Sequence, residues 1–125
     1  MSPLCLVVDD SRVIRRMATD ILKSMGLRTA EAEHGGKAVE FCRQMVPDMV
    51  LLDWNMPEMD GITCLRALRA AQLEPRPIVM MCTTESGLSK IREALEAGAD
   101  EYIMKPYDRD MMLAKLEQLG LMEPA

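Results

Sequence analysis

The stretch Met49-Val-Leu-Leu-Asp-Trp-Asn-Met-Pro-Glu-Met-Asp-Gly61 decides the fold of this chain. Its first four residues form an apolar run, which is typical of a strand that is buried on both faces. Asp53 ends that run, and a turn that contains Pro and Gly follows. A carboxylate therefore stands at the carboxyl end of a buried strand, which is where open α/β sheets bind their ligands.

Three further apolar runs also end in polar side chains. They are Leu4–Val8 before Asp9 and Asp10, Ile78–Cys82 before Thr83, and Tyr102–Met104 before Lys105. The carboxyl ends of parallel strands meet at one edge of a sheet. We therefore expect three acids, a hydroxyl and an amine to converge there.

Segments with helical spacing of apolar residues alternate with these strands. The predicted helices carry the stripes Val13 to Met25, Ala38 to Met45, Ile62 to Leu68, Leu88 to Leu95 and Met112 to Leu119. Asp60 and Asp108 precede two of them as N-caps, and Arg28–Ala32 is a shorter alternating strand. This order predicts an α/β fold, a doubly wound five-stranded parallel sheet with five helices, in which residues 1–125 form a single domain.

The composition excludes several function classes. Apolar residues make up 49% of the 125 residues, which is enough for a core, and the net charge of -5 without a basic stripe argues against direct binding of nucleic acid. The sequence has no run near the roughly 20 apolar residues of a membrane span and no signal-peptide layout. We expect a monomeric cytoplasmic protein without membrane insertion.

The four cysteines are widely spaced and form no C-x-x-C pair, which argues against a zinc site. Each lies in an apolar setting. We therefore interpret Cys5, Cys42, Cys64 and Cys82 as reduced core residues, as is usual in the cytoplasm.

The acids Asp9, Asp10 and Asp53 indicate a metal site. Two carboxylates about 4 Å apart repel each other by roughly 4 kcal/mol at an effective dielectric constant near 20, so such a cluster takes up a proton or a cation. Oxygen ligands favour a hard divalent ion, and Mg²⁺ fits best because it pairs one or two carboxylates with a phosphate. One acid could instead cap the helix that starts near Ser11, but a third acid on another strand exceeds what capping needs.

Lys105 and Thr83 indicate that the ligand carries phosphate, because an ammonium suits phosphate oxygens and a hydroxyl can donate to them. A plain Lys105–Asp53 ion pair and a helix cap are the alternatives. There is no G-x-x-x-x-G-K-[ST] loop for ATP and no Ser/His/Asp or Cys/His set. We interpret the lone histidine, His34, as a surface residue. The remaining chemistry is phosphoryl transfer onto Asp53.

These motifs resemble the receiver domains of two-component response regulators, and among them the single-domain CheY-like chemotaxis regulators. The resemblance covers essentially the whole chain. It rests on Val7-Val-Asp-Asp10, Asp53-Trp-Asn-Met-Pro57, Met59-Asp-Gly61, Thr83, Ala97-Gly-Ala99, Tyr102 and Lys105-Pro106. It implies the CheY/flavodoxin-like strand order 2-1-3-4-5 and a cis peptide bond before Pro106.

The resemblance also implies roles for individual residues. Asp53 would be the phosphoacceptor, and Mg²⁺ would be bound by Asp9, Asp10, Asp53 and the backbone carbonyl of Asn55. Lys105 and Thr83 would contact the phosphoryl oxygens, and Thr83 and Tyr102 would form a switch. The side chains of Asn55 and Glu85 would influence how long the phosphate persists.

The implied phosphodonor is a histidine kinase. No output domain is expected after the last helix, so the output would be a protein contact on the surface of the last two helices and the last strand. The implied target is a flagellar motor switch protein. A phosphorelay intermediate, a phosphate sink and a regulator of another enzyme are the alternatives. The domain would catalyse its own phosphorylation and dephosphorylation without turning over external substrates.

Two other classes of protein fit the sequence less well. Aspartate-nucleophile phosphatases carry an acid two residues after the nucleophile, which lies on their first strand. Here Asn55 occupies that position and Asp53 lies on the third predicted strand. A flavin- or nucleotide-binding domain fits least, because the acid cluster would repel its phosphates.

Overall fold

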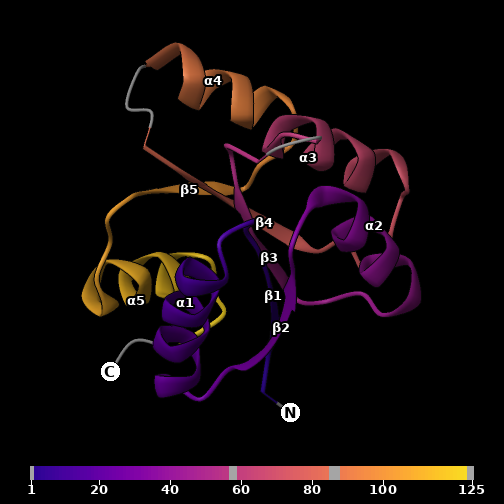
Figure 1. The fold of residues 1–125 in the computed structure, drawn as a ribbon. Coiled ribbons are helices and arrows are strands. Elements are labelled where there is room, and N and C mark those ends of the chain that lie inside the picture. Colours follow the sequence, from indigo (N-terminus) through magenta and orange to yellow (C-terminus); the bar gives the residue numbers. More distant parts are fainter. Residues whose placement is uncertain (1, 57–58, 85–87, 124–125) are drawn as a thin grey trace.

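The computed structural model describes residues 2–56, 59–84 and 88–123. Strands and helices alternate along the chain, as the sequence predicts (Figure 1). The elements are β1 Leu4–Val8, α1 Arg12–Ser24, β2 Arg28–Ala32, α2 Gly35–Gln44, β3 Met49–Asp53, α3 Gly61–Ala70, β4 Ile78–Thr83, α4 Leu88–Glu96, β5 Glu101–Met104 and α5 Arg109–Gln118.

The five strands form one parallel sheet in the order β2-β1-β3-β4-β5, which confirms the predicted fold. The chain adds β2 on one side of β1 and β3 on the other, so the order reverses between β1 and β3. Val8 is level with Leu52 in the register of these two strands. Asp9 and Asp53 are therefore carried to the same height at the carboxyl edge, at the position where doubly wound sheets bind ligands.

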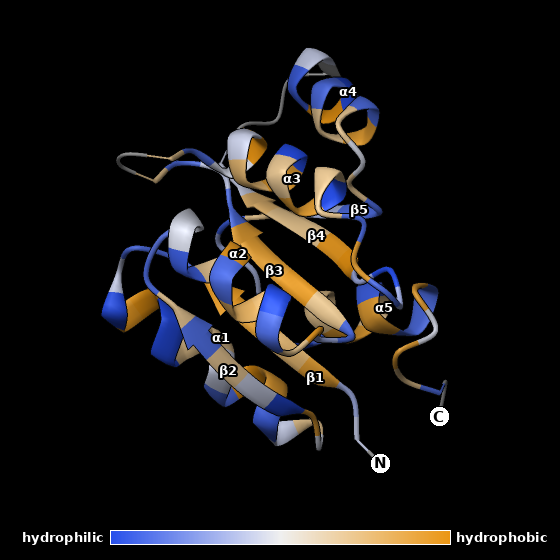
Figure 2. Cartoon of the chain, turned by 90° about the vertical axis from the view of Figure 1, so that its right-hand side faces the viewer, coloured by the Kyte–Doolittle hydropathy of each residue, from blue (hydrophilic) through white to orange (hydrophobic). Residues whose placement is uncertain are grey.

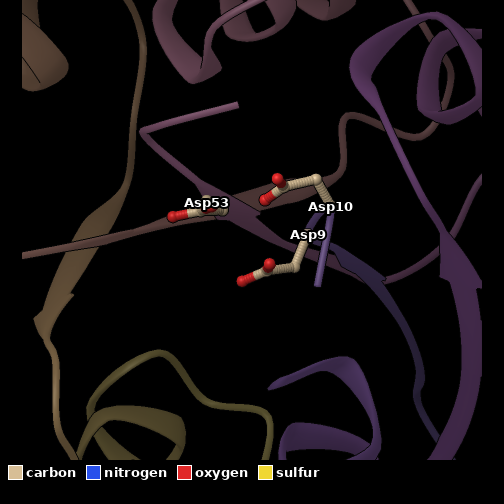
Figure 3. A group of neighbouring side chains, drawn as sticks. All are labelled: Asp9, Asp10 and Asp53. Carbon is tan, nitrogen blue, oxygen red and sulfur yellow. The ribbon is translucent and has the colours of Figure 1, made fainter. Parts of the chain in front are cut away.

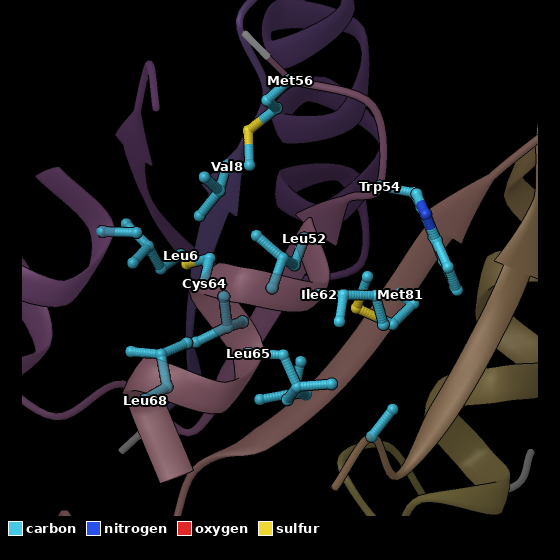
Figure 4. Packing of buried hydrophobic residues seen from close by; sticks show 14 of the residues in the cluster. Leu6, Val8, Leu52, Trp54, Met56, Ile62, Cys64, Leu65, Leu68 and Met81 are labelled. Atoms are coloured by element: carbon cyan, nitrogen blue, oxygen red, sulfur yellow. The ribbon is translucent and has the colours of Figure 1, made fainter. Parts of the chain in front are cut away.

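Alternate strand residues face two separate hydrophobic layers. Leu6 and Leu52 belong to the cluster shown in Figure 4, which packs against α2, α3 and α4. Cys5 and Leu51 belong to the other cluster, which packs against α1 and α5. Because both faces are covered, β3 and β4 are hydrophobic along most of their length, whereas the outer strand β2 is mainly hydrophilic (Figure 2).

The helix faces differ from the predicted stripes at several positions. On α4, Leu95 is 50% exposed, and the neighbouring Ala94 is buried instead. On α1, Val13 and Met17 are exposed, while Ala18 and Leu22 pack into the core. Residues four positions apart share one face of a helix. The pair Ala18 and Leu22 therefore turns inward, and the pair Val13 and Met17 lies on a different face.

The predicted N-caps are present. Asp60 accepts a hydrogen bond from the backbone N–H of Thr63, and Asp108 accepts one from Met111. A cap that the sequence analysis missed is His34, which is half-buried and accepts through Nδ1 from the backbone N–H of Lys37. The imidazole ring thereby satisfies one of the backbone donors left free at the start of α2.

The cysteines are buried and not disulfide-bonded, as expected. Burial raises the pKa of the Cys5, Cys64 and Cys82 thiols to about 12 and that of Cys42 to about 11. These thiols are therefore uncharged near neutral pH, as befits core residues.

The predicted cis bond between Lys105 and Pro106 is present, and the Glu74–Pro75 bond is also cis. Within the described part of the chain, no helix combines the length and the apolar character that crossing a membrane requires.

Candidate functional site

Three carboxylates gather where β1 and β3 end (Figure 3). Asp9, Asp10 and Asp53 each offer one oxygen atom, and these atoms all lie within 4.8 Å of one another. Asp9 and Asp53 are buried, whereas Asp10 is exposed. The acids that the sequence placed on one sheet edge are thus close enough to share a ligand.

Lys105 joins this cluster from the end of β5. Its Nζ atom lies 2.9 Å from Oδ1 of Asp53 and 3.2 Å from Oδ2 of Asp9. The ion pair with Asp53, which the sequence left open as an alternative, is therefore formed, and the same ammonium also contacts a second acid. An amine and three acids meet at this edge, as the strand ends predict.

Opposing effects act on the charges of Asp53 and Lys105. Burial raises the pKa of Asp53, the hydrogen bond from Lys105 lowers it, and the charge of Asp9 raises it, with a net pKa above the ordinary value. Burial lowers the pKa of Lys105, but the hydrogen bond to Asp53 and the nearby negative charges outweigh it, so that pKa is raised. Lys105 is therefore an ammonium at neutral pH.

The donor set fits a divalent metal ion. Three carboxylates face one ammonium, so an excess of negative charge remains at the cluster. The net upward shift in the pKa of Asp53 shows that this excess and burial disfavour its charged form. Oxygen donors with uncompensated negative charge are the ligands that Mg²⁺ prefers.

Thr83 ends β4 and is buried next to this cluster in the sheet order. Its backbone carbonyl accepts a hydrogen bond of 2.9 Å from the N–H of Lys105, which ties the ends of β4 and β5 together. The end of β5 therefore places Lys105 at the site in a fixed position relative to Thr83.

Asn55 directly follows the Asp53–Trp54 corner and is exposed. Its backbone N–H donates to the Asp53 carboxylate, which lowers the pKa of that group and partly offsets the effect of burial. Glu85, the other residue expected to flank a bound phosphate, lies outside the described residues. Its position relative to Asp53 stays a prediction.

Tyr102 is half-buried on β5, opposite Met81 of β4. The Lys115 ammonium lies 4.9 Å from the centre of its ring and 3.1 Å from Oε1 of Glu101. Glu101 in turn accepts from the backbone N–H of Tyr102. Neither the Lys115–Tyr102 contact nor the Lys115–Glu101 ion pair was anticipated, because no local sequence pattern links β5 with the middle of α5.

The end of β3 and the start of α3 approach each other closely through their backbones. The N–H of Gly61 donates to the Trp54 carbonyl at 2.8 Å. A Cβ atom at Gly61 would lie 2.4 Å from the Asp53 carbonyl oxygen and 2.8 Å from Cα of Trp54, which are prohibitive distances. Glycine is therefore required where α3 begins against the end of β3.

Sequence reasoning also missed Arg15. Its Nη1 atom donates to the backbone carbonyl of Asp9 at 2.6 Å, and its Nε atom donates to Glu31 at 3.0 Å. The available signal was an arginine in the first turn of the helix that follows the acid pair, but nothing in the sequence shows that this side chain folds back.

Comparisons with known proteins agree with this arrangement. The family model for the response regulator receiver domain matches residues 5–117. The chemotaxis protein CheY of Bacillus subtilis is 38% identical over 119 residues, which cover 94% of this chain and 98% of that protein.

Solved structures give the same picture. The chemotaxis protein CheY4 of Vibrio cholerae superposes with a TM-score of 0.89 at 29% identity, covering 94% of this chain and 98% of that one. The receiver domain of a sensor histidine kinase from Pseudomonas aeruginosa, solved with a magnesium ion in its active site cleft, has a TM-score of 0.85 at 25% identity and covers 94% and 97%. The family match and the identity over nearly the full length together show that this chain belongs to the response regulator receiver domain family.

Proposed function

We propose that Asp53 accepts a phosphoryl group from the phosphohistidine of a histidine kinase in a magnesium-dependent reaction. One observation carries the proposal, namely the buried Asp53 carboxylate within a cluster of three acids and 2.9 Å from an ammonium. Family membership supports it as well, since such domains are typically signalling domains rather than enzymes with external substrates.

The transfer is a substitution at phosphorus. A carboxylate oxygen of Asp53 forms the new P–O bond as the P–N bond to the kinase imidazole breaks, and the imidazole, which already carries a proton on its other ring nitrogen, leaves as a neutral ring. Lys105 then exchanges its contact with Asp53 for one with a phosphoryl oxygen. The ammonium already lies at the nucleophile, so it needs no long movement.

The residues present fit a magnesium ion held by Asp9, Asp10, Asp53 and the backbone carbonyl of Asn55. When bound, the ion would neutralise negative charge at the transferred group. The magnesium ion in the similar Pseudomonas aeruginosa receiver domain supports this choice. For hydrolysis of the aspartyl phosphate by the same site, the side chains of Asn55 and Glu85 would set the access of water.

An apolar groove of about 300 Å³ lies beside the site and supports a protein as the donor. Its lining includes Ile14 and Met17 of α1 together with Lys105, Pro106 and Tyr107. A protein surface can cover such apolar side chains next to Lys105.

The output would be a change in a protein-binding surface. Phosphorylation replaces the carboxylate of Asp53, of charge -1, with an acyl phosphate of charge about -2. Thr83, at the neighbouring strand end, would turn to donate to the new oxygens, and Tyr102 would move into the space it leaves. This shifts the population between two arrangements of the surface formed by α4, β5 and α5.

The relatives named above support a role in chemotaxis. CheY of Bacillus subtilis and CheY4 of Vibrio cholerae are chemotaxis proteins, so we propose a cytoplasmic, monomeric domain whose phosphorylated form binds a flagellar motor switch protein. Co-precipitation with such a protein that depends on phosphorylation separates this role from that of a phosphorelay intermediate, a phosphate sink or a regulator of another enzyme.

The phosphoryl transfer itself is tested with phosphoramidate, a small donor with the same P–N bond as phosphohistidine. Intact mass spectrometry should show one added phosphoryl group on the wild-type protein in Mg²⁺ and none after chelation. Asp53→Asn should remain unlabelled. Full labelling of Asp53→Asn would contradict the assignment of the nucleophile.

A further inference from the structure

Asp9 is held by hydrogen bonds from several parts of the chain. Its backbone N–H donates to the carbonyl of Ala32 at 3.2 Å, and its Oδ1 accepts from the N–H of Ser11 at 2.9 Å. Its Oδ2 lies 3.2 Å from Nζ of Lys105. Its backbone carbonyl accepts from Nη1 of Arg15 at 2.6 Å. The last contact comes from a side chain that the proposed phosphoryl transfer does not use.

Arg15 makes this contact from the first turn of α1, and its side chain is only 12% exposed. The backbone N–H of Arg15 donates to the carbonyl of Ser11 at the start of the helix. The side chain of Arg15 folds back over the connection between β1 and α1 to reach Asp9. At the same time its Nε atom donates to Glu31 of β2 at 3.0 Å. The rigid fork of a guanidinium can satisfy two such acceptors at once.

The position of the Asp9 carbonyl governs the direction of Asp10. The peptide unit is planar, so the oxygen that Arg15 holds and the nitrogen of Asp10 belong to one rigid group. Fixing that oxygen fixes the rotation about the Cα–C bond of Asp9, and therefore the direction in which Asp10 leaves the strand. Asp10 is exposed, so no burial of its own side chain provides this restraint.

Such a restraint is needed because the three carboxylates repel one another. The ligand oxygen atoms of Asp9, Asp10 and Asp53 lie within 4.8 Å of one another, and like charges at this separation disfavour their own approach. A loop free to rotate would therefore turn the Asp10 carboxylate away from Asp53. A hydrogen bond from a charged donor is about twice as strong as one between neutral groups, which suits it to oppose this tendency.

We propose that Arg15 is a positioning residue for the metal site, which holds the Asp9–Asp10 peptide so that both acids face Asp53 before the cation binds. This inference rests on the proposed function only through the assignment of the three acids as magnesium ligands. Arg15 contacts neither the ion nor the phosphoryl group.

Positioning and simple charge predict opposite effects when Arg15 is neutralised. Removing a positive charge near a cation site strengthens cation binding by Coulomb's law. Losing the restraint on the loop weakens binding, and changing a group that orients a metal ligand typically costs 10–100-fold in affinity. The direction in which the Mg²⁺ affinity changes therefore separates the effect of positioning from that of charge.

The matched control is Arg16. It lies on the same helix and pairs with Asp20 at 3.6 Å, with both side chains well exposed. Arg15→Met and Arg16→Met change the net charge equally, but only the first removes a contact with Asp9. Magnesium binding to each metal-free protein is followed by the fluorescence of Trp54, which adjoins Asp53, without any phosphodonor.

We expect Arg15→Met to raise the dissociation constant for Mg²⁺ by about tenfold or more, while Arg16→Met leaves it unchanged or lowers it. Binding by Arg15→Met that is as tight as wild type would overturn the inference. If wild-type protein itself failed to bind Mg²⁺, the proposed function would fail instead, so the two failures are distinguishable.

A second measurement needs no metal. Amide hydrogen exchange at Ser11, whose N–H donates to Asp9, should be faster in metal-free Arg15→Met than in wild type and unchanged in Arg16→Met. Should Arg15→Met not fold, Arg15→Lys serves in its place. Its single ammonium keeps the charge but not the two-pronged contact, so weaker Mg²⁺ binding and faster Ser11 exchange are again expected. Wild-type behaviour of this variant in both measurements would overturn the inference.

Discussion

Nζ of Lys105 lies 2.9 Å from Oδ1 of Asp53. Asp53 ends β3 and Lys105 follows β5, and β4 lies between these two strands in the sheet. The bond occupies a lone pair of the group that we propose as the nucleophile and keeps a cation next to it. It also brings the ammonium within 3.2 Å of Asp9. Lys105 therefore takes the place of part of the positive charge that a divalent ion would supply.

Neutralising Lys105 should strengthen magnesium binding. In Lys105→Met the three acids lose the ammonium that offsets their charge, so we expect the dissociation constant for Mg²⁺ to fall several-fold. Phosphorylation at saturating Mg²⁺ should persist, whereas binding of the partner protein should no longer respond to it. Titration of Trp54 fluorescence measures the first effect. Weaker magnesium binding would contradict the assignment of the acids as ligands.

Magnesium affinity should fall with decreasing pH, and the fall should begin above the ordinary pKa of an aspartate. A proton competes with the metal for Asp53, and the pKa of this carboxyl group is raised, mainly by burial. Competition therefore sets in at pH values above the ordinary pKa of aspartate, which is about 3.9. Mg²⁺ titrations followed by Trp54 fluorescence at a series of decreasing pH values test this prediction. A magnesium affinity that stays constant down to the ordinary pKa of aspartate would count against it.

Replacing Gly61 by alanine should destabilise the fold through a steric clash. The new Cβ atom would meet the Asp53 carbonyl oxygen at 2.4 Å and Cα of Trp54 at 2.8 Å, and because both of these atoms belong to the backbone, neither can move cheaply. We expect a loss of about 1–3 kcal/mol in the free energy of unfolding, the usual range for overpacking.

Gly36→Ala provides the matched control for that substitution. This glycine is the second residue of α2, where a Cβ atom would come 3.3 Å from the His34 ring, a tight contact with a side chain that can shift. Urea denaturation should therefore show a clearly smaller loss of stability for Gly36→Ala than for Gly61→Ala, and equal losses would refute the steric explanation.

The N-cap of α3 should make a pH-dependent contribution to stability. Hydrogen bonds from Thr63 lower the pKa of Asp60, so the charged carboxylate is favoured in the folded state. This contribution is fully present above the unfolded pKa, about 3.9, and is lost as the pH falls through the lower folded value. We expect Asp60→Ala to cost about 1 kcal/mol at neutral pH.

Thermal denaturation of wild type and Asp60→Ala across this range of pH measures that difference. The two curves should approach each other in acid, because a protonated Asp60 caps less well than a carboxylate. A difference in stability that stayed constant with pH would show that the charge of Asp60 has no part in it.

The strands and the polar residues at the carboxyl edge of the sheet could be predicted because both are local properties of the sequence. An apolar run ending in Asp53 or Lys105 indicates a buried strand with a polar end, whatever surrounds it. The order of the strands was not available from the residues and came from the resemblance to a family. The observed topology confirms it.

Contacts between distant side chains could not be predicted in this way. Arg15 reaches the Asp9 carbonyl, and Lys115 covers the Tyr102 ring, because tertiary packing places α1 and α5 beside those strands. On α4, helical spacing made Leu95 a core candidate, yet the small Ala94 faces the sheet. Periodicity finds an apolar stripe but does not show which part of it the neighbouring elements cover.

The central claim, that Asp53 receives the phosphoryl group with the help of a cation held by its acidic neighbours, is tested most directly by locating the modified residue. Protein treated with phosphoramidate is reduced with borohydride, which converts an aspartyl phosphate to homoserine, and is then analysed by tandem mass spectrometry. We predict homoserine at position 53 in samples that contained Mg²⁺ and none in chelated samples. Homoserine at another acid, or equal conversion with and without Mg²⁺, would contradict the account.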